Sequence, residues 1–473
     1  MSLSKNIWII NPFDQLPNES DVPLRFWTLS KELASQGYRV IWWSSDFSHR
    51  HKIKRSPCID TDGFSIKLIK TPSYKDNIGI DRIRSHMAFS KNFYEEAIKG
   101  LKNNDLEMPF RIVTSLPPLW IAESVFKIKD YINKKVNSDK ELECNPKIFC
   151  KVVIDIMDAW PEVFYRIFSK RVKDFIAPFL LLPFHRSARI AYQRADKISA
   201  VGQSYLEIAK GYLKKNKDNF DIINKEKKKS NNQKLIKPLH LCYHGVDLTR
   251  FKYSLILNKL SKYNNLIKQT FDNFKLKNKK KYLQIVHIGS LNSGYDIQTI
   301  IDFAKKWEKE GKLSIQIHFA GKGVQLDNIK KRSKKLGLLK STNFKNQKSQ
   351  IIFHGYINKS NINKLLLSSD IGIVSNRADT LVACPYKAGE YAGAGLAIIS
   401  CLNGEFNELL NSWKSGLGYE EENIQSLFNV ISKYANNFDL LSKHCLNSRK
   451  MAENLFDRKK IYQNFTKFII NDL

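Results

Sequence analysis

Lys387 and Glu390 are the residues whose types and spacing most clearly suggest chemistry. They follow a short apolar run, the polar loop 376–384 and Pro385, and a second apolar run comes after them. This order predicts a buried strand, a loop, a short helix from Pro385 to about Ala394, and another strand. Free N–H groups at a helix N-terminus attract anions, so a cation, amide donors and a carboxylate would meet there. Such a set suits a phosphorylated sugar, and a solvated helix surface is the structural alternative.

Three loops in the same part of the chain follow predicted strands, at Gly289, Gly321 and Asn376. Parallel strands end at one edge of their sheet, and ligands of open α/β sheets bind at that edge. Glycines in such loops let backbone amides approach a diphosphate closely. Together with Lys387 and Glu390, the three loops predict a nucleotide site.

The N-terminal half contains two further candidate residues. Asp158 directly follows an apolar run of strand type, where it could take part in chemistry or cap a helix that starts near Pro161. Arg25 begins the helix after the first loop, where it could meet an anion or simply lie on the surface. That first loop lacks the GxGxxG spacing, which disfavours a nicotinamide-dependent dehydrogenase.

The elements that must position these residues form an alternating pattern of strands and helices, which predicts an α/β fold with doubly wound sheets. A chain of 473 residues, 42% of them hydrophobic, can form two or three domains with large cores. We expect an N-terminal Rossmann-like domain at 1–248 with a Lys/Asn-rich surface insertion at 214–237, a linker at 249–281, and a C-terminal Rossmann-like domain at 282–440. The remaining helical segment, 441–473, could pack back on the N-terminal domain.

The formal net charge of +32 requires an anionic partner or surface. Basic residues flank a short, proline-interrupted apolar patch between residues 164 and 194, which favours an anionic membrane surface over a buried core helix. The densest basic run, in the insertion, has no interleaved aromatic residues, so specific nucleic-acid binding is not expected.

Seven scattered cysteines, without paired spacing, are typical of reduced residues in a cytosolic protein. The N-terminus does not resemble a signal peptide, and no window reaches the roughly 18 apolar residues that cross a bilayer. We therefore expect a cytoplasmic protein bound to the inner face of the cytoplasmic membrane.

The ordered set of motifs resembles the retaining GT-B glycosyltransferases of family 4, of the type that builds bacterial cell-surface polysaccharides. The similar segments are Asp158-Ala159-Trp160-Pro161-Glu162 (the family's D-x-W-P-E), 195–201 (A-D-x-I-x-x-V), His244-Gly245-Val246-Asp247 (N-G-V-D), Gly289-Ser290-Leu291, Gly321-Lys322-Gly323 and Pro385 to Tyr391. The resemblance covers nearly the whole chain outside the insertion. It implies two Rossmann-like domains facing a central cleft, with the nucleotide site in the second.

The resemblance also implies roles for individual residues. Glu390 would hold the nucleotide ribose, and the loop through Pro385 would hold the diphosphate. The predicted donor-binding set is Gly289, Ser290, Gly321, Lys322, Arg377, Pro385, Lys387 and Glu390; the predicted catalytic residues are Asp158 and Glu390, and the acceptor side comprises Arg25 and Asp158.

The chain departs from the family pattern at two places. The glutamate that many members have eight positions before Glu390 is Val382 here, and Ser290, Asn292 and Ser293 occupy the loop where many members place Arg and Lys. Lys387, Arg377 or Lys322 must then supply the positive charge for the diphosphate.

These features predict transfer of a sugar from a nucleotide-diphosphate sugar to a lipid-linked or saccharide acceptor, with retention of configuration, in surface polysaccharide or glycan assembly. No DxD motif or metal-ligand cluster occurs at a plausible site, so we expect no metal and no cofactor, and a cation with aligned amides would stabilise the leaving diphosphate. The alternatives are a GT-B sugar-nucleotide epimerase or phosphorylase and, in a different class, a basic nucleic-acid-binding protein with salt-sensitive affinity for DNA.

Overall fold

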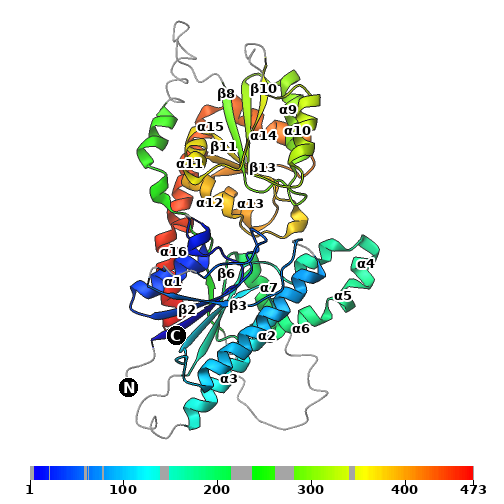
Figure 1. Ribbon diagram of the computed structural model, residues 1–473. Helices are drawn as coiled ribbons and strands as arrows, with labels where there is room; N and C mark the ends of the chain where they lie inside the picture. Colours follow the sequence, from blue (N-terminus) through cyan, green and yellow to red (C-terminus); the bar gives the residue numbers. More distant parts are fainter. Residues whose placement is uncertain are drawn as a thin grey trace. The chain divides into compact units, whose positions relative to one another are not determined.

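A computed structural model describes residues 5–20, 22–57, 61, 63–76, 79–138, 149–214, 237–261, 282–339 and 347–471. The chain divides into two compact units, Met1–Cys242 with Lys460–Leu473, and Tyr243–Lys459. Each unit contains one parallel β-sheet with helices packed against it (Figure 1). The predicted α/β class with two Rossmann-like sheets is therefore confirmed.

The first unit has a seven-stranded sheet in the order β3-β2-β1-β4-β5-β6-β7. Its strands are β1 (Asn6–Ile10), β2 (Arg39–Ser45), β3 (Ser65–Ile69), β4 (Arg111–Leu116), β5 (Lys151–Ile156), β6 (Lys197–Ala200) and β7 (Leu239–Leu241). Its helices are α1 (Arg25–Ser35), α2 (Ile80–Lys102), α3 (Trp120–Ser138), α4 (Lys170–Phe175), α5 (Ala177–Leu180), α6 (Leu182–Arg194) and α7 (Gln203–Lys214), with the 3-10 helices η1 (Pro17–Glu19) and η3 (Glu162–Ile167). Strands β1 and β4 are buried throughout, including the polar residues Thr114 and Ser115 of β4.

The C-terminal residues complete the core of the first unit. Tyr462, Phe465 and Ile469 of α16 (Arg458–Ile470) are buried in the same hydrophobic cluster as Phe26 and Ile7. Residues 441–459, which the sequence grouped with this segment, belong to the second unit.

The second unit has a six-stranded sheet in the order β10-β9-β8-β11-β12-β13. Its strands are β8 (Tyr282–Ile288), β9 (Ser314–Ala320), β10 (Ser349–Gly355), β11 (Ile371–Val374), β12 (Ala397–Ser400) and β13 (Gly416–Gly418). Its helices are α9 (Ile297–Glu310), α10 (Leu326–Lys335), α11 (Lys359–Ser368), α12 (Tyr386–Gly393), α13 (Glu405–Trp413), α14 (Ile424–Asn436) and α15 (Phe438–Met451), with the 3-10 helices η5 (Leu248–Arg250) and η7 (Ala378–Thr380) and the π-helical turn η8 (Ala452–Phe456).

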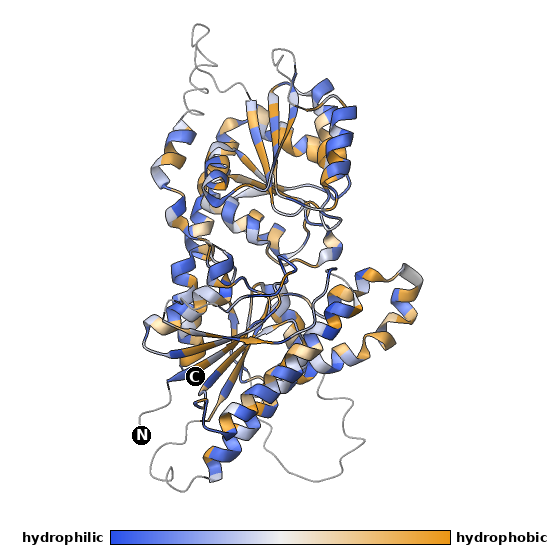
Figure 2. Cartoon of the chain, viewed as in Figure 1, coloured by the Kyte–Doolittle hydropathy of each residue, from blue (hydrophilic) through white to orange (hydrophobic). Residues whose placement is uncertain are grey.

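The predicted linker at 249–281 contributes to the second unit rather than only joining the two. Ile256 and Leu260 are buried in the hydrophobic core of that unit, which also contains Trp307. Residues 262–281, and residues 215–236 of the predicted insertion, lie outside the described residues. The strands of both sheets are predominantly hydrophobic, whereas many helices carry a hydrophilic side (Figure 2).

Candidate functional site

The loops after β8, β9 and β11 form one connected surface in the second unit. The three strands are neighbours and run parallel, so their loops lie at one edge of the sheet, as the sequence predicts. Backbone hydrogen bonds join the loops: the Leu291 amide donates to the Lys322 carbonyl at 3.0 Å, and the Arg377 amide donates to the Gly294 carbonyl at 3.0 Å. The edge is therefore held together before any ligand is present.

The glycines of these loops have different roles. A Cβ at Gly321 would lie 1.7 Å from the carbonyl oxygen of Gly289, so the loops can pack only with glycine at position 321. The amides of Gly289 and Gly321 donate to the carbonyls of Ala320 and Gly355. A donor-binding role for these two residues stays a prediction. A Cβ at Gly289 would meet the Lys387 Nζ at 3.7 Å, so Gly289 leaves space beside that ammonium.

Lys387 is a buried cation in the first turn of α12. Only 8% of the residue is exposed, and its Nζ lies 4.0 Å from the centre of the Tyr295 ring. Across the described parts of the chain, this Nζ has no hydrogen-bond partner. Burial strips water from the ammonium and lowers its pKa from 10.5 to about 7. An uncompensated buried charge is unfavourable, so an anion at this position would be strongly attracted.

Local contacts fix α12 against the sheet. Pro385 is the N-cap rather than the first helical residue, and the helix begins at Tyr386. The buried Tyr391 hydroxyl accepts a hydrogen bond from the Ile288 amide at 2.9 Å. A Cβ at Gly372 in β11 would lie 2.4 Å from the Tyr391 ring, so glycine there makes room for the tyrosine. These contacts place the first turn of α12 beside the loop that follows β8.

Glu390 lies one turn after Lys387 on α12 and is 5% exposed. Its Oε1 accepts a hydrogen bond from Arg250 Nη1 at 2.6 Å, whereas its Oε2 has no partner within the described segments. Arg250, in η5, also donates from Nε to the Asn363 Oδ1 at 3.1 Å. The arrangement fixes the carboxylate and leaves one oxygen for a ligand. No sequence pattern pointed to Arg250, which is one of several basic residues between positions 249 and 281.

Arg377 and Lys322, the other two cations predicted to bind the diphosphate, are less buried than Lys387. Arg377 pairs through Nε with Glu421 at 3.0 Å and through Nη2 with Glu422, so two carboxylates compensate its charge. A donor-binding role for Arg377 stays a prediction, and its charge is already compensated. Lys322 is exposed, with its Nζ 5.5 Å from the centre of the Tyr356 ring, and Ser290 is an exposed loop residue. Of the three cations, Lys387 is the one that the structure places buried at the helix N-terminus.

Arg25, in the first unit, is part of a buried ion pair. Its Nε lies 2.6 Å from the Asp155 Oδ2, its Nη2 donates to the Asp155 Oδ1 at 2.9 Å, and its Nη1 donates to the Cys242 carbonyl at 3.0 Å. Asp155 already supplies an anion for Arg25, which is 4% exposed, so the alternative prediction of a surface residue is wrong. The acceptor-side role stays a prediction. The residue pattern of β5 does not reveal the ion pair, because Arg25 and Asp155 lie 130 residues apart in the sequence.

Asp158 lies directly after β5, at the carboxyl edge of the first sheet, and is half-buried. Its Oδ1 accepts a hydrogen bond from the Ala159 amide at 2.9 Å, and burial raises its pKa above the usual value. The helix η3 begins at Glu162 with Pro161 as its N-cap and has no side-chain cap, so Asp158 does not cap it. A catalytic role for Asp158 remains a prediction.

The segment 164–194 forms the helices α4, α5 and α6 and presents large apolar side chains to solvent. Phe175 and Phe179 are each 77% exposed, and Leu182 is 62% exposed. Figures 1 and 2 show these helices at the margin of the first unit, with hydrophobic residues along them. The alternative prediction, a buried core helix, is contradicted for these positions.

No helix among the described residues is long and apolar enough to cross a membrane. Within the same ranges, no group of three or more His, Cys, Asp or Glu side chains is arranged to hold a metal ion.

Residues 268–451 match the family model described as Glycosyl transferases group 1. This range contains the whole sheet of the second unit, as well as Lys387 and Glu390. No curated protein sequence matches the chain.

Several solved structures are similar over nearly the full length. HepE of Anabaena, in complex with UDP and glucose, has a TM-score of 0.58 at 12% identity, and the match covers 98% of each chain. Sucrose-phosphate synthase of Thermosynechococcus elongatus has a TM-score of 0.61 at 11% identity, also covering 98% of each chain. WaaG, a glycosyltransferase involved in lipopolysaccharide biosynthesis, has a TM-score of 0.57 at 12% identity and covers 98% of this chain and 100% of its own. At these identities the likeness establishes the fold, which is GT-B as predicted.

Proposed function

We propose that this chain, which contains a glycosyl transferases group 1 domain and has the GT-B fold, transfers a sugar from a nucleotide-diphosphate sugar to a lipid-linked or saccharide acceptor. The observation that carries the proposal is the Lys387 ammonium, buried without a partner in the described segments at the start of α12. Similar structures contain UDP and glucose or UDP-glucose, which supports a nucleotide sugar as donor. The involvement of WaaG in lipopolysaccharide biosynthesis supports a place in glycan assembly.

The donor would bind through charge and hydrogen bonds at α12. Lys387 and the N-terminus of α12 attract the diphosphate, since the helix N-terminus and the ammonium both favour negative charge. Glu390 accepts a hydrogen bond from a ribose hydroxyl through Oε2, while Arg250 holds its other oxygen. Both contacts bind the nucleotide part of the donor, and neither involves the sugar that is transferred.

The difficult step is departure of the diphosphate from the sugar. The bond from the anomeric carbon to the diphosphate oxygen breaks, and the acceptor oxygen bonds to the same face of that carbon, so the configuration is retained. The acceptor proton passes to the departing phosphate oxygen. Lys387 stabilises the negative charge that develops on the diphosphate, a preorganised electrostatic contribution. We assign to Asp158 the orientation of the acceptor hydroxyl or the stabilisation of positive charge on the sugar.

We further propose that the reaction needs no metal, because Lys387 supplies the positive charge that a divalent cation would otherwise bring. Activity should then be the same with EDTA and with added Mg²⁺. A loss of activity in EDTA that Mg²⁺ restores would contradict this part of the proposal.

We propose that the exposed apolar surface of α4, α5 and α6 binds the anionic inner face of the cytoplasmic membrane. Phe175, Phe179 and Leu182 provide apolar area, and the exposed Lys173 and Arg186 attract acidic headgroups, each adding roughly 1 kcal/mol near an anionic surface. Vesicles with anionic lipid should sediment the protein, and the double variant Phe175→Ser with Phe179→Ser should stay in the supernatant. Equal sedimentation of the variant and the wild type would exclude this surface.

The test of the donor site is a thermal-shift screen of the full chain against UDP- and GDP-sugars. A ligand at 100 times its dissociation constant adds about 2.7 kcal/mol of stability, which raises the unfolding temperature measurably. Incubation with membranes and labelled donors then tests transfer to lipid. If a donor is consumed when no acceptor is present, the protein is an epimerase or phosphorylase, and if no nucleotide sugar stabilises it, the proposal fails.

A further inference from the structure

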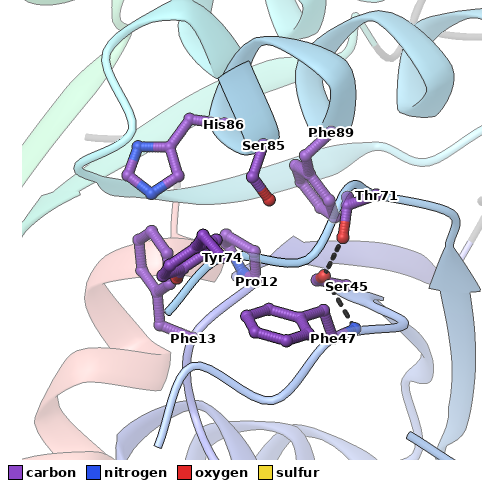
Figure 3. A pocket seen from close by; sticks show the side chains of 9 residues that line it. All are labelled: Pro12, Phe13, Ser45, Phe47, Thr71, Tyr74, Ser85, His86 and Phe89. Atoms are coloured by element: carbon purple, nitrogen blue, oxygen red, sulfur yellow. Dashed lines mark hydrogen bonds between the residues drawn. The ribbon is translucent and has the colours of Figure 1, made fainter. Parts of the chain in front are cut away.

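A second cluster of chemically capable residues lies in the first unit, around a small cavity at the carboxyl edge of its sheet (Figure 3). Phe13 follows β1, Tyr74 follows β3, and His86 projects from α2. Figure 3 shows the side chains of these three residues on the same side of the cavity. None of them belongs to the site proposed for the nucleotide sugar.

Two cations lie on the aromatic rings of this cluster. The guanidinium carbon of Arg82 is 5.8 Å from the centre of the Phe13 ring and 5.5 Å from that of Trp160. The Nζ of Lys52 is 4.4 Å from the centre of the Tyr74 ring. Cation–π contacts of this kind help to fix the positions of the two charged groups.

The two histidines of the cluster remain neutral and position its other members. Burial, with Arg82 nearby, lowers the pKa of His86 to about 3 and that of His49 to about 3. The neutral His86 accepts a hydrogen bond from Arg82 Nε at its own Nε2 (3.4 Å), and the His49 Nδ1 bonds to the Tyr74 hydroxyl at 2.6 Å. The positive charge of the cluster is therefore concentrated on Arg82 and Lys52.

The Nδ1 atom of His86 has no hydrogen-bond partner within the described residues. Because its Nε2 is the acceptor, the proton of the neutral ring must be on Nδ1. The residue is 2% exposed, and this N–H finds no partner in the ranges that the structure describes. A buried donor without an acceptor is unfavourable, and a polar ligand would remove that cost.

The cluster adjoins the residue assigned to catalysis in the first unit. Arg82 interacts electrostatically with Asp158, and Trp160 follows Asp158 by two residues. A group bound by Arg82 would therefore lie near the carboxylate that orients the acceptor hydroxyl. Saccharides commonly present apolar ring faces that suit aromatic side chains such as Phe13, Tyr74 and Trp160.

We infer that this cluster recognises an acceptor saccharide that carries an oxyanion, phosphate or carboxylate, with Arg82 and Lys52 as the residues that determine specificity. The guanidinium provides a planar fork of N–H donors that matches an oxyanion, and Lys52 adds a second point charge. The inference rests on the proposed function and adds the chemical class of the acceptor.

The test is equilibrium binding of the full chain to three probes: N-acetylglucosamine 1-phosphate, glucuronate and uncharged N-acetylglucosamine. We expect at least one anionic probe to bind tenfold or more tightly than the uncharged sugar. Arg82→Gln should abolish that preference, and Lys52→Met should reduce it severalfold. The matched control is Arg84→Gln on the same helix, whose side chain is 71% exposed and which should behave as the wild type.

Retention of the preference in Arg82→Gln, or equal binding of charged and uncharged probes to the wild type, would overturn the inference. Preference for the phosphate probe or for glucuronate identifies which oxyanion is recognised. Stabilisation by a nucleotide sugar is measured in parallel on each variant, because it reports the separate site around Lys387. If that stabilisation persists while the acceptor probes fail, the proposed function stands and only the acceptor class is wrong. Lys52→Met provides the decisive comparison if Arg82→Gln does not fold.

Discussion

Lys387→Met tests whether the buried ammonium is held for an anion. The shift of its pKa from 10.5 to about 7 corresponds to roughly 5 kcal/mol, at about 1.4 kcal/mol per pKa unit. Between pH 7 and pH 10.5 the unfolded chain binds the Lys387 proton and the folded, ligand-free chain does not. The contribution of Lys387 to the free energy of unfolding therefore rises with pH between pH 7 and pH 10.5, and it is lowest below pH 7.

The variant should thus be more stable than the wild type without ligand, by up to about 5 kcal/mol at pH 6, and the difference should shrink toward pH 10. Methionine has a similar length and an apolar end, so it fills the space without the buried charge. Urea denaturation at several pH values measures the difference. Lys433→Met, at an exposed position in α14, is the control and should show no pH-dependent difference.

The affinity of the wild type for a nucleotide sugar should fall as the pH rises, whereas its stability without ligand should increase. If the charged ammonium is the form that binds, wild-type affinity should fall about 50-fold between pH 7 and pH 9, because the charged fraction falls by that factor. A nucleotide sugar is the appropriate probe because its diphosphate is esterified at both ends and does not titrate in this range. Lys387→Met should bind weakly and without this pH dependence. The reasoning is refuted if the variant keeps the wild-type affinity and pH profile.

Three other substitutions test neighbouring contacts. Glu390→Ala should reduce turnover of the donor tenfold or more, through loss of a charge-assisted hydrogen bond of about 1.5–3 kcal/mol, and kinetics with an unchanged rate would contradict its ribose role. Arg250→Met should leave Glu390 buried without its cation and cost roughly 3–5 kcal/mol, measured by urea denaturation, whereas a loss below about 1 kcal/mol would show that the pair is dispensable. Gly321→Ala should lower the unfolding temperature by several degrees, because its Cβ would lie 1.7 Å from the Gly289 carbonyl oxygen; an unchanged temperature would mean that the loops separate easily.

The sequence by itself determined the α/β class, most strands of both sheets and the edge at which the loops of the second unit meet; the short edge strand β13 (Gly416–Gly418) was not predicted. These follow from local rules: apolar runs of strand length, helical periodicity and the parallel direction that alternating elements require. Lys387 and Glu390 were also recognisable, because Pro385 and the following helical pattern fix the start of a helix. The apolar surface of α4, α5 and α6 could be predicted from its composition.

Only the tertiary structure decided which charges are free for a ligand. Arg25, Arg377 and Lys387 are all basic residues, but the first meets Asp155 and the second meets Glu421 and Glu422, while the third is buried without such a partner among the described residues. Glu422 lies 45 residues from Arg377, Asp155 lies 130 residues from Arg25, and Glu390 lies 140 residues from Arg250. Whether a charge is compensated depends on what the fold brings beside it, and no local pattern contains that information.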